Sequence, residues 1–338
     1  MKKKPKILVV GSFVMDLIVT SKRFPNSGET VLGIGYQTAP GGKGANQAVQ
    51  AARLGADVTM VGKVGCDAFG DALLDSARAS GVNVSHVLRA EDAPSAVGNV
   101  QLELGDGKCA NRIIVVPGAN MTITPEEVAF LEDEIAQYDM VLLQLEIPME
   151  INCLAARFAA KAKVPVMLNC APIASMPQEL LKNVTYLSPN EHEAQWLTKI
   201  EIKDDTSIRT AMDVLREMGV QRALITLGSR GAVYAAGDGV LLSPAISGLA
   251  VMDTTAAGDS FVGAFCTAAA LGVPAEKALS FANHTAALTV CRMGAQPSLP
   301  TIDEVLALME AQGKDTAIFS PLKNKRGALS CPVLTYSK

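Results

Sequence analysis

Two acidic residues bracket a run of small residues in segment 253–261, which reads DTTAAGDSF and precedes a small-residue, helix-like stretch. If Ala256, Ala257 and Gly258 form the turn that opens this helix, their backbone N–H groups point at one spot. The helix dipole makes that spot favourable for an anion such as phosphate. Asp259 then lies beside the anion, where it can take a proton from the attacking group. The segment therefore indicates phosphoryl transfer, and a Thr-capped helix with a favourable acid is the open alternative.

A glycine-rich segment precedes the first predicted helix: residues 40–48 read PGGKGANQA. Glycines such as Gly42 allow the backbone to approach a ligand closely. Lys43 and Asn46 are three residues apart, so both side chains can reach the same side of the helix start. This is not a Walker A loop, because no Ser or Thr follows Lys43 and no glycine stands at the required earlier position. The alternative is a glycine-rich helix start with a solvated lysine.

Two further acids stand where strands are predicted to end. Asp16 follows the first strand and its Gly-Ser turn, and Glu146 follows the apolar run 140–145. Open α/β sheets bind ligands at the carboxyl ends of their strands, and carboxylates accept hydrogen bonds from sugar hydroxyls. Taken alone, Asp16 is equally typical of a turn or cap, and Glu146 of a solvated strand end.

A second group of segments could bind a nucleotide. In 188–193, SPNEHE, Glu193 could orient magnesium-bound waters, although an acid in a first helical turn also complements the helix dipole. The segment 226–231, TLGSRG, could fold its glycines and N–H groups around a nucleotide with Arg230 near phosphate. A plain turn between strands is the alternative for that segment.

The elements that must position these residues alternate along the chain. Strands are predicted at 7–10, 58–61, 140–145, 164–168 and 223–227. Helices are predicted at 44–54, 68–79, 125–136, 150–162, 206–218, 260–271, 275–291 and 302–311. The alternation predicts an α/β fold with a central, mostly parallel sheet and helices on both faces.

Two segments break this alternation, and we assign them to a small β-sheet lid. They are residues 14–38 and residues 95–117, the second a hairpin with its turn at 105–107. Residues 1–312 are predicted to form a single domain that includes the lid. The segment 313–338 mixes Lys, Pro and Ser without a period and is predicted to be a poorly ordered tail.

The composition narrows the classes of partner. A net charge of −4 gives no basic field for nucleic acid or an anionic membrane, and one Trp and five Tyr offer few platforms for stacked bases. The apolar run 261–273 is too short to span a bilayer. Seven cysteines without CxxC spacing and three histidines argue against a zinc site. We therefore expect small-molecule partners and a cytoplasmic protein with reduced thiols.

In this order, from about residue 7 to residue 308, the segments resemble the ribokinase family of sugar kinases, the PfkB group. GGKGANQA at 41–48 and DTTAAGDSF at 253–261 are the most specific motifs, joined by QLE at 144–146 and GAQPS at 294–298. The resemblance implies transfer of the ATP γ-phosphoryl group to the 5-hydroxyl of D-ribose, giving ribose 5-phosphate. It also implies Mg²⁺, an activating K⁺ and a homodimer formed through the lid.

By motif position, the resemblance assigns a role to each site residue. Asp259 resembles the catalytic base, and the anion hole is matched by Ala256, Ala257 and Gly258. Sugar-binding positions are matched by Asp16, Gly42, Lys43, Asn46, Glu146 and Asp259. Nucleotide-binding positions are matched by Asn190, Thr226, Gly228, Ser229, Arg230, Gly231, Gly258 and Asn283. Glu193 matches an acid tied to magnesium through water. Potassium, held mostly by main-chain oxygens, is matched by Asp253, Thr255, Thr289, Arg292, Gly294 and Ser298.

At one position the chain departs from the family pattern, and this leaves the identity of the sugar substrate undecided. Where many ribokinases carry Gly-Ser-x-Asn-x-Asp, this chain has Val14 in place of the Asn. A valine cannot hydrogen-bond a hydroxyl, and deoxyribokinases resemble this chain in having an apolar residue there. We therefore hypothesise relaxed recognition of the ribose 2-hydroxyl. A deoxyribokinase or another pentose or sugar kinase is the first alternative, a nucleoside or sugar-phosphate kinase another, and a non-catalytic sugar-binding regulator the last.

Overall fold

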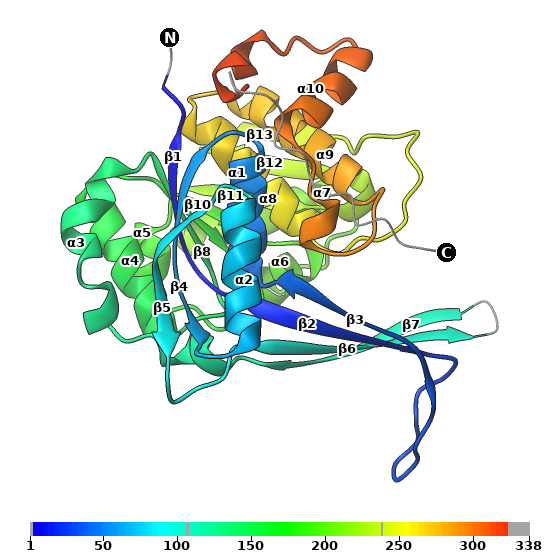
Figure 1. The fold of residues 1–338 in the computed structure, drawn as a ribbon. Coiled ribbons are helices and arrows are strands. Elements are labelled where there is room, and N and C mark those ends of the chain that lie inside the picture. The colour runs from blue at the N-terminus through cyan, green and yellow to red at the C-terminus, as the bar shows by residue number, and fades with distance from the viewer. Residues whose placement is uncertain (1–2, 106–107, 238, 324–338) are drawn as a thin grey trace.

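A computed structural model describes residues 3–105, 108–237 and 239–323, which form two β-sheets with helices packed on the larger one (Figure 1). The larger sheet has nine strands in the order β13-β12-β11-β10-β9-β8-β1-β4-β5. Pairs from β11 to β5 are parallel, and β12 and β13 add antiparallel at one edge. Its strands are β1 (Lys6–Val10), β4 (Asp57–Gly65), β5 (Asn83–Ala90), β8 (Met140–Gln144), β9 (Val166–Asn169), β10 (Tyr186–Ser188), β11 (Arg222–Thr226), β12 (Ala232–Ala236) and β13 (Gly239–Ser243).

Helices cover both faces of this sheet, so each face has its own buried core. Val9 and Phe265 belong to one core, and Val10 and Leu143 belong to the other. The first face carries α1 (Lys43–Arg53), α2 (Ala68–Ala79), α8 (Ala257–Ala270), α9 (Ala275–Thr289) and α10 (Ile302–Ala311). The second carries α3 (Leu131–Glu134), α4 (Met149–Lys161), α5 (Gln178–Asn183), α6 (Glu191–Thr198) and α7 (Asp205–Glu217). The predicted α/β fold is confirmed. Along the described ranges, no helix is both long and apolar enough to cross a bilayer.

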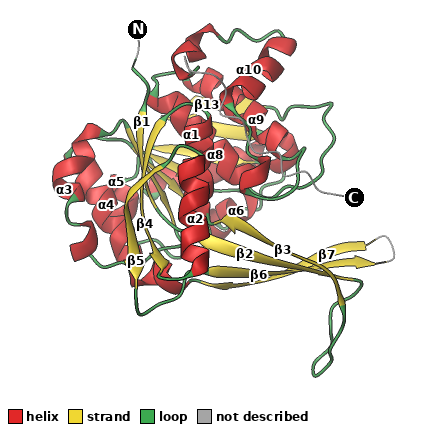
Figure 2. Cartoon of the chain, in the orientation of Figure 1, coloured by secondary structure: helices red, strands yellow, loops and turns green. Residues whose placement is uncertain are grey.

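The smaller sheet is the predicted β lid, and it extends away from the helices (Figure 2). Its order is β3-β2-β6-β7, with β2 and β6 parallel and the other pairs antiparallel. The strands are β2 (Val14–Ser21), β3 (Gly33–Gly41), β6 (Val97–Gly105) and β7 (Lys108–Val116). β3 runs three residues past the predicted lid boundary at 38, directly into the glycine-rich segment. The predicted hairpin turn falls partly on residues 106–107, which lie outside the described residues.

The predicted helix at 125–136 is wrong as a continuous element. It is divided into 3-10 turns at Glu126–Val128 and Ile135–Gln137 with the single α-turn α3 between them, because hydrogen bonds such as that from Val128 N to Pro125 O span three residues. Strands β5, β10, β12 and β13 were not predicted. β10 is only three residues long, which is too short to show a distinct period.

Part of the segment that was predicted to be a poorly ordered tail is folded. Within 313–323, a 3-10 turn at Ala317–Leu322 buries Phe319 and Leu322 completely, and the Phe319 ring stacks on Phe281 of α9 at 4.4 Å. Two apolar residues in a segment rich in Lys and Pro carry no periodic signal, so this anchor could not be recognised. Residues 324–338 lie outside the described part of the chain.

Candidate functional site

The glycine-rich segment brings the start of α1 against the end of β1. Gly44 packs so closely that an added Cβ would lie 2.5 Å from the Ser12 nitrogen, and Gly42 has a φ of 92° that favours glycine. The Ser12 hydroxyl donates to Glu146 Oε2 at 2.5 Å, and the Lys43 amide donates to the same oxygen at 2.9 Å. Glu146 therefore caps the positive end of α1 and links three segments that are distant in the sequence.

Asp259 is buried in the first turn of α8, and two side chains of α1 orient it. Asn46 Nδ2 donates to Asp259 Oδ2 at 2.9 Å, and Gln47 Nε2 donates to Oδ1 at 3.1 Å. Gln47 is held in turn by Gln144 at the end of β8, whose Nε2 donates to Gln47 Oε1 at 2.7 Å. Because amide groups donate to both oxygens, the carboxylate has a fixed orientation and remains a proton acceptor.

Asn46 also offers an unused acceptor at this point. Its Oδ1 is buried and has no hydrogen-bond partner among the described residues. A buried amide oxygen without a donor is costly, and a ligand hydroxyl would satisfy it. The residues that the sequence proposed for binding a sugar therefore leave an open acceptor beside the proposed base.

Lys43 lies among three carboxylates of this site. Burial opposes its charge, but Asp259, Glu146 and Glu193 together hold the pKa of the Lys43 ammonium above its ordinary value. The lysine therefore stays protonated and offsets the negative charge of the site, which would otherwise repel an anionic co-substrate.

Asp16 lies on β2, at the base of the lid, in a confined position. Cβ atoms added at Gly98 and Gly41 would lie 2.3 and 2.9 Å from its two carboxylate oxygens. Burial, and then the nearby charge of Glu146, raise the pKa of Asp16 to about 6. Val14, two residues earlier on the same strand, is buried and approaches the same Gly98 position. Val14 and Asp16 therefore lie on one face of the strand, as the sequence hypothesis requires.

The turn before α8 has the geometry expected of an anion site. Ala256 is left-handed, with φ 59° and ψ 8°, and the helix begins at the next residue. The Ala257 N–H donates back to Thr254 O at 3.2 Å, so this predicted anion-hole donor is already engaged within the turn. For the exposed Gly258 N–H, the described residues supply no acceptor, and the space around Gly258 is open. Gly258 is therefore the clearest donor to a bound anion.

Asp253 ties this turn to the segment that follows α9. Its Oδ1 accepts from the Thr255 amide at 2.9 Å and the Thr255 hydroxyl at 2.7 Å, and its Oδ2 accepts from the Gly294 amide at 2.8 Å. Burial alone would raise the pKa of Asp253, but these hydrogen bonds hold it below the ordinary value. The structure thus brings together three of the positions that the resemblance assigns to potassium.

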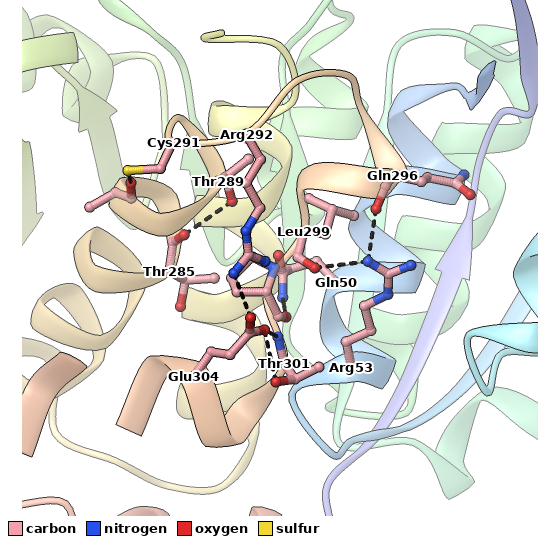
Figure 3. A network of polar contacts seen from close by, with 12 residues as sticks. Gln50, Arg53, Thr285, Thr289, Cys291, Arg292, Gln296, Leu299, Thr301 and Glu304 are labelled. Atoms are coloured by element: carbon pink, nitrogen blue, oxygen red, sulfur yellow. Dashed lines mark hydrogen bonds and ion pairs between the residues drawn. The ribbon is translucent and has the colours of Figure 1, made fainter. Parts of the chain in front are cut away.

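The other three predicted potassium positions use their side chains elsewhere. The Thr289 hydroxyl lies 2.9 Å from the Ser260 hydroxyl, Arg292 pairs with Glu304 at 2.5 Å, and the Ser298 hydroxyl donates to Ala295 O at 2.7 Å (Figure 3 shows Thr289, Arg292 and Glu304). A cation here would have to use main-chain oxygens at these positions. Main-chain oxygens can bind a large monovalent ion, and the potassium site implied by the resemblance stays a prediction.

The Asn190 and Glu193 pair forms a reciprocal cap at the start of α6. The Glu193 amide donates to Asn190 Oδ1 at 2.9 Å, and the Asn190 amide donates to Glu193 Oε2 at 2.8 Å. Burial raises the pKa of Glu193 against the lowering effect of its hydrogen bond to Asn190. Asn190 also forms a parallel bridge with Thr226, so the two segments that were predicted to bind a nucleotide lie side by side. A single carboxylate of this kind fits magnesium held through its waters.

The loop after β11 turns at Gly228 and Gly231, both with positive φ, around a 3-10 turn at Gly228–Arg230 that includes Ser229. Its Arg230 does not extend freely: the guanidinium pairs with Glu191 and donates to Lys203 O at 3.1 Å. Asn283 on α9 donates to Ser243 O at 3.0 Å and so fastens the end of β13. These two side chains are engaged by the protein itself, and their predicted contacts with nucleotide stay predictions.

Sequence reasoning did not assign a role to Ser12, Gln47 or Gln144. Gln47 directly follows Asn46 in the GGKGANQA motif, and Gln144 is a polar residue that ends an apolar strand. A buried polar residue at the carboxyl end of a parallel strand was the available signal, because such residues must find partners.

The chain is similar to known proteins over most of its length. The model of the family described as pfkB family carbohydrate kinase matches residues 4–302. A ribokinase of Bacillus subtilis is 43% identical over 304 residues, covering 90% of this chain and 99% of that protein. A deoxyribokinase of Salmonella typhi is 32% identical and covers 88% of this chain and 96% of its own length. The structure of Arabidopsis thaliana ribokinase complexed with ribose and ATP superposes with a TM-score of 0.85 at 35% identity, covering 90% and 99% of the two chains. The chain belongs to the pfkB family of carbohydrate kinases.

Proposed function

We propose that this protein transfers the γ-phosphoryl group of ATP to the 5-hydroxyl of D-ribose, producing ribose 5-phosphate. The observation that carries the proposal is the buried Asp259 carboxylate, which Asn46 and Gln47 orient beside the open N–H of Gly258. A base next to an anion site is what phosphoryl transfer to a hydroxyl requires. The ribokinases among the relatives, and the ribose and ATP named for the Arabidopsis structure, favour this acceptor.

The sugar is held between the lid and the start of α1. Asp16 and Glu146 accept hydrogen bonds from its hydroxyls, and Asn46 Oδ1 takes another. Gly42 and Lys43 lie at the turn that faces it. Closure of the lid over the sugar excludes water, which would otherwise accept the phosphoryl group and waste ATP.

Asp259 accepts the proton of the 5-hydroxyl as that oxygen bonds to the γ-phosphorus, while the bond from the γ-phosphorus to the bridging oxygen breaks and ADP leaves with that oxygen. The N–H groups at the start of α8 stabilise the charge on the γ-phosphoryl oxygens. Lys43 stays protonated beside them. The nucleotide is bound, in this proposal, by residues at or after the ends of β10 and β11 and on α9: Asn190, Thr226, Gly228, Ser229, Arg230, Gly231 and Asn283.

Two ions complete the proposal. Glu193 would orient the waters of a magnesium ion, which neutralises phosphate charge when bound. Potassium would be held chiefly through main-chain oxygens, at Asp253, Thr255, Thr289, Arg292, Gly294 and Ser298. A cation there stabilises the turn before α8, because Asp253 already joins that turn to Gly294.

The direct test measures ADP release over a panel of ribose, 2-deoxyribose, other pentoses, fructose and nucleosides, with K⁺ present or replaced by Na⁺. We expect ribose to give the highest kcat/KM and K⁺ to raise kcat. Turnover with nucleosides alone, or no turnover with any sugar, would overturn the proposal.

2-Deoxyribose is the second candidate acceptor, and one observation favours it. Val14 is buried beside Asp16 and supplies only methyl groups where a 2-hydroxyl would need a partner. The deoxyribokinase of Salmonella typhi is also among the relatives. A ribose preference above about a hundredfold, worth roughly 2.7 kcal/mol, would exclude relaxed recognition at this position.

We also propose that the protein is a cytoplasmic homodimer formed through the lid. The lid exposes an unusual set of large apolar side chains: Leu32, Ile34, Tyr36, Ile113, Ile114 and Val116. Large apolar side chains exposed in such number on one small sheet are typical of a protein interface, and a second copy would also cover the lid edges. Sedimentation velocity tests this, because a Tyr36→Glu variant should shift the protein from dimer to monomer. A monomeric parent protein would contradict the proposal.

A further inference from the structure

The segment that links α9 to α10 is held in place by side chains of α1 (Figure 3). This link, residues 290–301, contains Gly294, whose amide binds Asp253 next to the proposed anion site. Links between helices usually lie on the surface and are mobile. Here Gln296 and Ser298 are buried, so the link is constrained by contacts that the proposed catalytic residues do not provide.

Arg53 at the end of α1 makes the strongest of these contacts. Its Nη1 donates to Gln296 O and to Leu299 O, both at 2.8 Å. One helical turn earlier, the buried Gln50 donates from Nε2 to Pro300 O at 3.0 Å. A guanidinium that bridges two main-chain oxygens fixes the course of the backbone more firmly than one neutral bond does.

A second helix supports the same point of the link. The Ser76 hydroxyl of α2 donates to Gln296 Oε1 at 2.7 Å, and Arg53 Nη2 lies 3.5 Å from the Ser80 hydroxyl. The far end of the link is fastened separately, by Arg292 with Glu304 of α10. Gly294 lies between these two anchors, so the position of its amide depends on both.

A continuous series of contacts therefore runs from Arg53 to the turn before α8. Arg53 fixes Gln296, Gly294 precedes Gln296 by two residues, and the Gly294 amide binds Asp253. Asp253 binds Thr255, which directly precedes the left-handed Ala256. The proposed sugar-binding residues lie at the opposite end of α1, about 15 Å away for ten residues at 1.5 Å each.

We propose that Arg53 is a positioning residue for the phosphate end of the site, which it sets through the link and Asp253 without touching substrate. The kinetic test of this inference rests on the proposed kinase function, and the hydrogen-exchange test does not. Gln50 helps to hold the same link through its single hydrogen bond to Pro300 O. Loss of Arg53 should impair the use of ATP while recognition of the sugar by Asn46 and Lys43 remains.

The test compares Arg53→Gln with Arg78→Gln, which removes an exposed arginine that pairs with Asp75 on the surface of α2. We expect Arg53→Gln to lower kcat/KM for ATP by about ten- to a hundredfold, while KM for ribose changes less than about twofold. Arg53→Lys, which keeps a charged donor, should recover part of the loss. Arg78→Gln should resemble the parent protein in both constants.

Amide hydrogen exchange gives a readout that needs no turnover. In Arg53→Gln, residues 292–298 should exchange at least about tenfold faster, and residues 43–50 at the parent rate. Gln50→Leu should give a smaller increase at the same residues and covers the case in which Arg53→Gln does not fold.

A general rise in exchange, or equal losses for ATP and ribose, would show a purely structural role and overturn the inference. If the parent protein phosphorylates no sugar, the proposed function fails, and the exchange pattern still decides the role of Arg53.

Discussion

Two carboxylates of the site are held in opposite ways. Asp259, on a helix of the core, accepts hydrogen bonds from Asn46 and Gln47 before any substrate arrives. Asp16, on a strand of the lid, has no donor to its side chain among the described residues, and burial raises its pKa to about 6. The core carboxylate is complete without ligand, whereas the lid carboxylate is not.

This difference agrees with the role that we propose for each residue. A base has to keep one orientation through the reaction, so contacts made by the protein itself are an advantage at Asp259. A carboxylate that recognises sugar hydroxyls must leave its oxygens available for them. If Asp16 binds the sugar as we propose, the cost of burying its carboxylate without partners is recovered when the sugar binds.

The largest expected effect tests the core side of the comparison. Asp259→Asn removes the proton acceptor while keeping the shape of the side chain, so kcat should fall by about 10²–10⁴-fold. Ribose affinity, measured by calorimetry, should change little. Asp92→Asn, an exposed acid on the surface, serves as the control. A variant at 259 with near-normal kcat would show that Asp259 is not the base.

The second prediction concerns the lid side. With a pKa of about 6, Asp16 loses its charge as the pH falls below that value, so kcat/KM for ribose should drop about tenfold per pH unit there. Asp16→Asn should lower kcat/KM at pH 7 by about 10- to 100-fold, because hydrogen bonds to a charged group contribute about 1.5–3 kcal/mol. Because asparagine does not titrate, kcat/KM of the Asp16→Asn variant for ribose should not change between pH 5 and pH 7. If the acidic decline persisted in the variant, another group would be responsible.

The site around these two carboxylates also shows which features could be predicted from the sequence and which could not. Asp259 could be proposed as the base from sequence because its motif combines small residues, a helix start and an acid within a few positions, and each part has a local physical meaning. Its partner Gln47 was not assigned, since the contact depends on how α1 packs against α8. The sheet was predictable from alternating apolar runs, whereas Phe319 was not, because a short buried turn has no period.

Residues whose proposed function depends on main-chain atoms were the hardest to find from the sequence. Gly294 and Ser298 came only from the resemblance, and nothing in their side chains indicates an ion. Arg53 gave no signal at all, since an arginine at a helix end is usually solvated, and only the folded chain shows which carbonyls it reaches.

The third prediction sharpens the lid side further. Val14→Asn adds a polar group next to Asp16, where a 2-hydroxyl would lie, so the preference for ribose over 2-deoxyribose should rise by about 5- to 50-fold, or about 1–2 kcal/mol. Val14→Ala is the matched control, because it opens space without adding a donor. The two kcat/KM values give the ratio directly. An unchanged ratio in Val14→Asn would place the 2-hydroxyl elsewhere.

The smallest effect concerns stability, and it separates the two carboxylates most directly. The pKa of Asp16 is about 6 in the folded protein and near 3.8 when unfolded, so the folded state binds the proton more tightly. Its charge therefore destabilises the protein fully above pH 6, and this penalty disappears as the pH falls to about 4.

A neutral side chain should remove that penalty. Asp16→Asn should raise the free energy of unfolding at pH 7 by about 1–2 kcal/mol, less than the full two-unit shift because the site is partly solvated. Urea denaturation at pH 7 and at pH 4 measures it, and the gain should vanish at the lower pH. Asp259→Asn should give no such gain, because it turns an acceptor of two amide hydrogen bonds into a group that can repel one of them. Equal stabilisation by both substitutions would mean that the protein holds the two carboxylates alike.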